Sequence, residues 1–140
     1  LAWAIFVLRF FSVRAKINAC FGGKLRNDVI KLMVRYSVNH FHRVLKRDGW
    51  LILGTPDFGS PCAQRFGPNY RMLHDKTHCS LFTLESCSRM LRDYGFAIED
   101  VQFPFPERYA TAENFMRWND TSKVSPPWPG NWMTFYARRT

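Results

Sequence analysis

The stretch that decides the fold runs from His42 to Asp57 and reads HRVLKRDGWLILGTPD. Its centre, Trp50–Gly54, is a continuous apolar run that begins after Gly49 and ends at Thr55-Pro56-Asp57. A run of this kind is typical of a strand that is buried on both faces, in a sheet covered by helices. The stretch therefore predicts a central strand of an α/β sheet.

The sequence before this strand predicts a helix. Apolar residues recur at helical spacing over 34–46, and basic residues crowd the last turn, where they complement the helix dipole. We interpret Asp28–Met33 (DVIKLM) as a short strand ahead of that helix. Residues 1–13 (LAWAIFVLRFFSV) are apolar but shorter than the ~20 residues that span a bilayer. Three interpretations stay open for them: a segment whose partner is missing, which we favour, a buried element, or an interfacial helix.

Beyond the central strand, loops alternate with regular elements. Residues 56–77 are rich in Pro and Gly and predict a long loop, of a length that usually serves binding. Thr83 is a plausible N-cap for a following helix, and Phe96–Phe103 predicts a strand with one irregularity at Glu99-Asp100. The remaining expected elements are a short helix within 107–118 and a last strand over Asn131–Arg138. A short turn precedes that strand, which can therefore pair antiparallel with its predecessor.

Composition indicates a single globular domain. The chain has 140 residues, of which 46% are hydrophobic, so a substantial core can form. The net charge of +9 comes from 20 Lys and Arg against 11 Asp and Glu, and a solvated basic surface is favoured over a nucleic-acid site. None of the four cysteines forms a C-x-x-C pair, and no signal peptide is legible. We therefore expect reduced thiols and a cytoplasmic location.

Two blocks of the sequence carry a resemblance to a known family. His42–Asp57 resembles the R-V-L-K-P-G-G-x-L-x-x-x-x-P-[ND] stretch of class I S-adenosylmethionine (SAM)-dependent methyltransferases, with Arg47-Asp48-Gly49 in place of Pro-Gly-Gly. His74–Leu91 and the following Tyr94-Gly95-Phe96 are similar to H-x-x-x-H-x-x-x-F-[ST]…L…G-F in the ubiquinone-biosynthesis-like branch (methyltransferase types 11 and 23). The tail Trp132–Arg139 looks like that family's closing strand.

The resemblance implies a fold and an activity. The expected fold is α/β, a partial Rossmann-like sheet with flanking helices, in which the last strand lies antiparallel between its two predecessors. The implied reaction is methyl transfer from SAM to a small-molecule acceptor. The family holds SAM through a glycine-rich turn after its first strand, and we find no such turn in these residues. We therefore interpret residues 28–140 as the C-terminal half of the domain and leave residues 1–27 unassigned.

The missing cofactor motif leads to expectations about behaviour. We expect this chain to be inactive alone and not to bind SAM alone, and its cofactor-binding residues are unknown. A truncated sheet edge predicts self-association. A rival hypothesis is a non-catalytic basic α/β module that binds an anionic partner, RNA or a membrane surface. No transmembrane segment is predicted.

Six residues are candidates for the acceptor site. His74 and His78 are the catalytic candidates, because the family places this stretch near the substrate mouth and imidazole can act as a general base near neutral pH. The candidates for substrate binding are Thr55, Asp57, Phe66 and Tyr70. The first two end a central strand, where ligands gather in α/β sheets. Loop-anchoring hydrogen bonds, turn capping and loop packing stay open as alternative roles.

A metal site is the last possibility that the sequence raises. Zinc could in principle be held by two histidines and two cysteines of this region, namely Cys62, His74, His78 and Cys79. These residues lack the usual ligand spacing, so no metal site is predicted.

Overall fold

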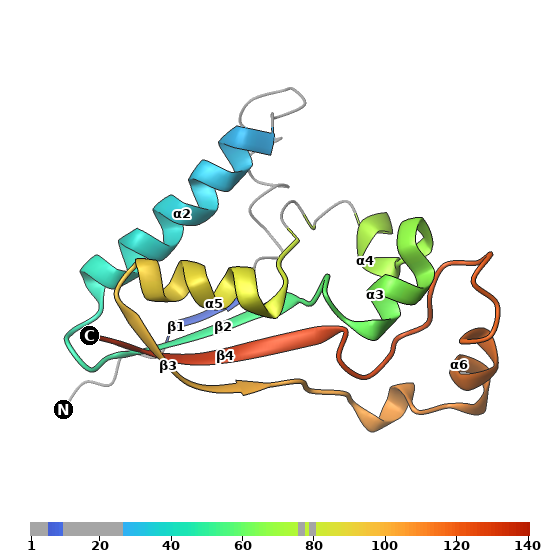
Figure 1. Ribbon diagram of the computed structural model, residues 1–140. Helices are drawn as coiled ribbons and strands as arrows, with labels where there is room; N and C mark the ends of the chain where they lie inside the picture. Colours follow the sequence, from blue (N-terminus) through green and yellow to red (C-terminus); the bar gives the residue numbers. More distant parts are fainter. Residues whose placement is uncertain (1–5, 10–26, 76–77, 79–80) are drawn as a thin grey trace.

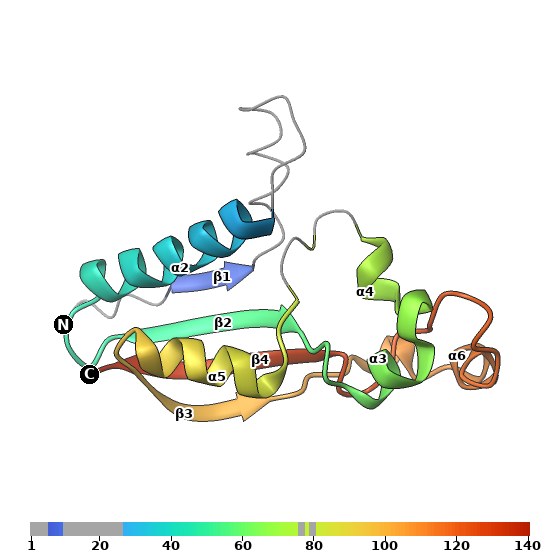
Figure 2. The same cartoon turned by 45° about the horizontal axis from the view of Figure 1, so that its top comes forward.

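The structure, a computed structural model, describes residues 6–9, 27–75, 78 and 81–140 (Figure 1). A four-stranded sheet in the order β1-β2-β4-β3 forms its centre. The strands are β1 (Phe6–Arg9), β2 (Trp50–Pro56), β3 (Phe96–Gln102) and β4 (Trp132–Arg139). Strand β1 runs parallel to β2, whereas β4 is antiparallel to both of its neighbours. Figure 2 shows β1 and β3 at the two edges.

Two helices cover one face of the sheet, α2 (Asn27–Val44) and α5 (Leu84–Asp93), as Figure 1 shows. Alternate residues of β2 and β4 point to this face and are buried together with side chains of both helices. The largest buried side chains of this sheet core are Leu45, Leu51, Leu53, Leu91, Phe96, Met133 and Phe135. The expectation that β2 is buried on both faces is wrong for its first half, because Trp50 and Ile52 stay partly exposed on the other face.

The first predicted strand is wrong. Asp28–Met33 lies in the first turns of α2, which begins about two turns earlier than the sequence pattern indicated. The apolar spacing of that run fits a helix as well as a strand, and short apolar runs do not separate the two. The strand that precedes α2 is β1, whose residues Phe6 to Arg9 pair with Leu51 to Gly54. The other residues of 1–13 lie outside the described part, and the domain boundary at 27/28 stays a prediction.

The predicted position of the last strand is confirmed. Strand β4 lies between β2 and β3, so the fold is the partial Rossmann-like α/β sheet that was expected. The register of β3 shifts between Ile98 and Asp100, where the sequence showed an irregularity. Thr83 caps α5 as predicted, in a capping box that it completes with Ser86.

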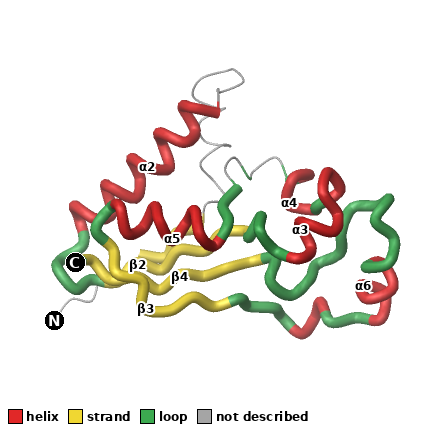
Figure 3. Tube along the Cα trace, viewed as in Figure 1, coloured by secondary structure: helices red, strands yellow, loops and turns green. Residues whose placement is uncertain are grey.

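The long predicted loop contains short helices. It holds α3 (Pro61–Phe66), a 3-10 turn (Gly67–Asn69) and α4 (Arg71–His74). A second 3-10 turn (Glu107–Tyr109) and α6 (Ala112–Arg117) follow β3. Figure 3 shows these short helices and the loops between them at one end of the sheet. Buried residues of α3 and its neighbours form a second core, made of Cys62, Ala63, Phe66 and Tyr70 with Met72, Trp118 and Trp128 against it.

None of the helices that the structure describes combines the length and the apolar character that crossing a membrane requires.

Candidate functional site

A cavity of about 430 Å³ lies beyond the carboxyl end of β2. Its walls come from α4 and the residues just after it, from the segment that follows β3, and from the segment that enters β4. Trp132, which lines it, pairs with Pro56 at the end of β2. This is the edge of an α/β sheet at which ligands gather.

Tyr70 connects the second core to the carboxyl end of β2 and to the segment that enters β4. Its hydroxyl donates to two backbone carbonyls, that of Asp57 at 3.1 Å and that of Asn131 at 3.3 Å. The Asp57 amide in turn donates to the Asn131 carbonyl at 3.0 Å. Burial raises the pKa of the Tyr70 phenol well above its usual value, so this hydroxyl stays protonated and keeps donating. Tyr70 is fully buried and does not line the cavity.

The Asp57 carboxyl group caps a turn. Its Oδ1 accepts the Gly59 amide at 2.8 Å, and only 8% of the residue is exposed. Burial raises the pKa of this carboxyl, although hydrogen bonds from the amides of Gly59 and Leu84 act in the opposite direction. Thr55 is buried one residue before the end of β2. Neither Asp57 nor Thr55 lines the cavity, and their substrate-binding role stays a prediction.

His78 lies in the cavity wall. Its Nδ1 is 3.2 Å from the Met72 carbonyl and 3.9 Å from Oδ2 of Asp75. A carbonyl can only accept, so Nδ1 carries the proton in the neutral ring and the lone pair lies on Nε2. The Asp75 carboxylate also lines the cavity, so an imidazole and a carboxylate lie side by side in its wall.

His74 lies elsewhere. It ends α4, is exposed, and its Nε2 is 3.2 Å from the Pro68 carbonyl. It lines a second cavity of about 300 Å³, together with Arg71 and Arg117. The structure therefore does not bring the two predicted histidines into one cavity, although Arg71 and Asp75 line both.

The predicted aromatic pair belongs to the second core. Phe66 is 3% exposed and meets the Trp118 ring edge-on at 5.7 Å between centroids. Trp118 stacks on Trp128 at 4.0 Å, and Trp128 reaches the cavity. The aromatic cavity wall consists of four residues that the sequence analysis missed, namely Phe105, Tyr109, Trp128 and Trp132. The signal was present in SPPWPGNW (125–132), which was interpreted only as a turn leading into a strand.

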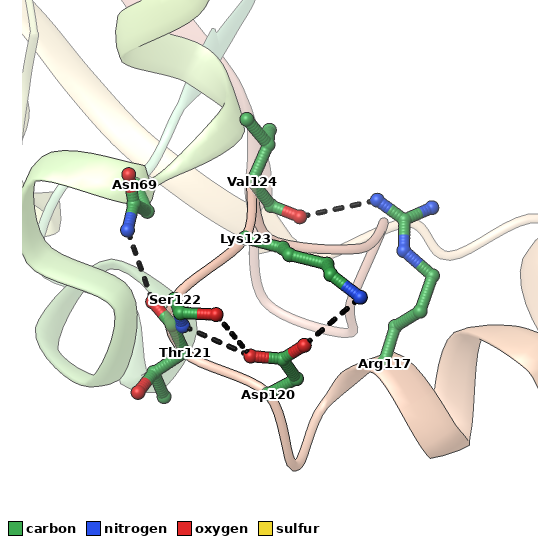
Figure 4. A network of polar contacts seen from close by, with 7 residues as sticks. All are labelled: Asn69, Arg117, Asp120, Thr121, Ser122, Lys123 and Val124. Atoms are coloured by element: carbon green, nitrogen blue, oxygen red, sulfur yellow. Dashed lines mark hydrogen bonds and ion pairs between the residues drawn. The ribbon is translucent and has the colours of Figure 1, made fainter.

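A polar network holds the loop that carries Trp128 (Figure 4). The Asp120 carboxylate accepts from the amide and the hydroxyl of Ser122 and pairs with Lys123 at 3.2 Å. The Asn69 side chain donates to the Thr121 carbonyl at 3.0 Å, which links this loop to the end of the turn before α4. The network thus connects the loop before Trp128 to the segment that leads into α4.

Comparison with protein-family models matches residues 35–101 to a methyltransferase domain. Residues 35–101 carry a methyltransferase-domain sequence. The match confirms the resemblance to class I SAM-dependent methyltransferases, and it covers the second half of α2, all of β2 and α5, and most of β3. The first cavity and this methyltransferase segment share Arg71, Met72, Asp75 and His78.

A solved structure from Thermotoga maritima is also similar to this chain. It is described as a SAM-dependent methyltransferase and possible histamine N-methyltransferase. The similarity covers 76% of this chain and 48% of that one, with 20% identity and a TM-score of 0.49. This chain thus spans about half the length of that methyltransferase. A comparison with curated proteins gives no match.

Two glycines near the carboxyl end of β2 were tested as a place for a cofactor. Gly54 and Gly59 are the glycines nearest the carboxyl end of β2. A Cβ on Gly54 would come within 3.2 Å of the Trp132 ring, and one on Gly59 within 3.2 Å of the Asp57 carboxylate. Side chains of this chain therefore fill the space beside both glycines, and neither glycine leaves room for a cofactor. No cofactor-binding residue is assigned.

Proposed function

We propose that this chain carries the acceptor side of a SAM-dependent methyltransferase that transfers a methyl group to a small molecule. The methyltransferase sequence of residues 35–101 supports the reaction class. The observation that carries the acceptor assignment is the cavity of about 430 Å³ beyond β2, lined by aromatic side chains and His78. Pockets for small molecules usually measure roughly 300–1,000 Å³ and combine apolar walls with a few polar groups.

His78 is the proposed general base. The acceptor loses a proton when its oxygen or nitrogen is methylated, and His78, which lines the cavity beside Asp75, is the group that we assign to take up that proton. Methyl transfer needs little covalent help, since positioning the acceptor and excluding water contribute most of the rate. We assign His74, in the second cavity, no part in this proton transfer.

The reaction class is tested with the full product of the gene. We expect labelled methyl groups to pass from SAM to compounds of a small-molecule extract. His78→Gln should lower the rate about 100-fold, as the loss of a general base typically does. His40→Gln, an exposed histidine on α2, is the matched control and should keep the rate within about twofold. Label recovered only in protein or RNA would contradict a small-molecule acceptor, and no transfer at all would contradict the reaction class.

The chain by itself offers a second test. SAM titrated into this 140-residue chain should release no binding heat, because its sequence lacks the glycine-rich turn through which the methyltransferase family holds SAM. Micromolar binding would contradict the half-domain interpretation. Sedimentation should show self-association, because β1 and β3 each leave one strand edge unpaired in the described sheet. A cytoplasmic location is part of the proposal, and the free thiols of Cys62 and Cys87 support it.

A non-catalytic anion-binding module is the second candidate. The exposed residues Arg43, Lys46 and Arg47 at the end of α2 favour it. This candidate predicts binding to RNA or anionic vesicles that weakens steeply with salt, without any methyl transfer.

A further inference from the structure

The charges that line the first cavity are unequal. Two guanidinium groups, Arg71 and Arg108, face one carboxylate, Asp75, and the imidazole of His78. The Asp75 carboxylate lies 3.9 Å from His78 Nδ1. Among the described residues, no ion pair joins Arg71 or Arg108 to a carboxylate. The lining therefore carries an excess of positive charge that protein carboxylates do not neutralise.

The two guanidinium groups both influence Tyr109, another residue that lines the cavity. Arg108 donates to the Tyr109 hydroxyl at 3.4 Å and lies over the Tyr109 ring at 4.9 Å from its centroid. The hydrogen bond and charge of Arg108 lower the pKa of the Tyr109 phenol, and the charge of Arg71 adds to this effect. A negative oxygen placed beside Tyr109 would meet the field of both arginines.

Most of the other lining residues are aromatic or proline. Trp128, Trp132 and Phe105 line the cavity together with Pro104, Pro106 and Pro127. Such walls favour a planar ring, because stacked and edge-to-face contacts add to the burial of its surface. A flexible aliphatic chain gains nothing comparable from these walls.

We infer that the first cavity binds a planar aromatic acceptor that carries an anionic oxygen group, a carboxylate or a phosphate. The ring lies among Trp128, Trp132 and Phe105, and the anionic group lies at Arg71 and Arg108. The inference rests on the proposed function only in naming the occupant as the methyl acceptor. The chemical class of the ligand is inferred from the residues that line the cavity.

The probes are benzoate, phenyl phosphate and benzamidine, which share a ring and differ in charge. Binding to the full chain is followed by the indole N–H signals of Trp128 and Trp132 in nitrogen-15 spectra. We expect both signals to shift with at least one anion, at an affinity about tenfold or more above that of benzamidine, as charge-assisted pairing with arginine implies. Tighter binding of benzoate than of phenyl phosphate assigns a carboxylate, and the reverse assigns a phosphate.

Variants locate the anionic group. Arg71→Gln and Arg108→Gln keep most of the side-chain length, and each should weaken anion binding about fivefold to tenfold. Arg89→Gln, an exposed arginine on α5, is the matched control and should leave the affinity unchanged. Equal or tighter binding of benzamidine overturns the inference. So does an unchanged anion affinity in both cavity variants, or the absence of saturable binding by every probe.

This assay separates the two proposals, since it uses neither a methyl donor nor turnover. Anion binding without methyl transfer in the full gene product would leave the ligand chemistry intact and remove the reaction class. Transfer to a cationic acceptor would do the opposite.

Discussion

The two cores of this molecule are built on different principles. The sheet core is mostly aliphatic, and regular strands and helices place its residues at fixed spacings. The second core is aromatic, and short helices and loops hold it through individual hydrogen bonds, such as those of Tyr70 and Asn69. The first therefore provides stability and the second shapes the cavity. The four predictions below test this division, from the largest expected effect to the smallest.

The strongest test removes a ring from the sheet core. Phe135 is fully buried in the central strand β4. Phe135→Ala should lower the free energy of unfolding by about 4 kcal/mol, since it deletes a large side chain and leaves a cavity. Chemical denaturation followed by circular dichroism measures the loss. A loss below about 1 kcal/mol would contradict a rigid sheet core.

The matching change in the second core is Phe66→Ala. We expect a loss of about 3 kcal/mol for this buried ring, with a faster exchange of amides around the cavity than in the sheet. Native-state hydrogen exchange compares the two regions in one experiment. Uniform acceleration over both regions would show that they unfold as a single unit.

Each core contains one free buried cysteine, and the pH dependence of stability distinguishes the two cysteines. Burial raises the pKa of Cys87 to about 12, whereas for Cys62 hydrogen bonds from Ser125 and Asn131 counteract the burial effect. Because the folded pKa lies above the unfolded one, stability is complete below about pH 9 and falls as the pH rises towards 12. At pH 10.5 the loss from Cys87 is about 2 kcal/mol.

Cys87→Ala should therefore cost stability at pH 7 and recover about 2 kcal/mol relative to the parent at pH 10.5. Cys62→Ala is the control and should recover less. Urea denaturation at the two pH values measures both variants. An equal recovery of stability in both variants would contradict the expected difference between Cys87 and Cys62.

The smallest test concerns turns. Asp48 adopts a φ of 61° before β2, at a position where the resembling motif has glycine. Asp48→Gly should raise stability by up to about 1 kcal/mol, because glycine takes this conformation without strain. In the loop before β4, Gly130 has a φ of 81°, and Gly130→Ala should cost about 1 kcal/mol although the space around it is open. Thermal melts measure whether each substitution raises or lowers the melting temperature. A Gly130→Ala variant that is more stable than the parent would show that this loop relaxes.

The same division explains what the sequence could predict. The apolar run at Trp50–Gly54, the cap at Thr83 and the insertion of β4 follow from local pattern or resemblance, because regular elements repeat at fixed periods. The prediction of a strand at Asp28–Met33 is wrong, because a run of six residues is too short to distinguish the helical period from the strand period. The cavity wall was missed because Phe105 and Trp128 meet through loops that obey no period.

Sequence reasoning named candidate side chains for the site but could not place them relative to one another. His78 was named and lines the cavity, whereas His74, four residues earlier, lines another. One helical turn separates two such residues in a continuous helix, but α4 ends at His74 and Asp75 has an extended backbone. Arg71 and Arg108 could not be paired in advance, because their proximity depends on the packing of the second core.

The position of β4 also governs when this fold can be completed during protein synthesis. Strand β3 pairs only with β4 among the described strands, and β4 occupies residues 132–139. While the ribosome is still holding these residues, β3 has nothing to join, and β2 exposes the edge that β4 later covers. The sheet can therefore close only once residues 132–139 have left the ribosome, and until then the edges of β2 and β3 that β4 will cover are open to other chains.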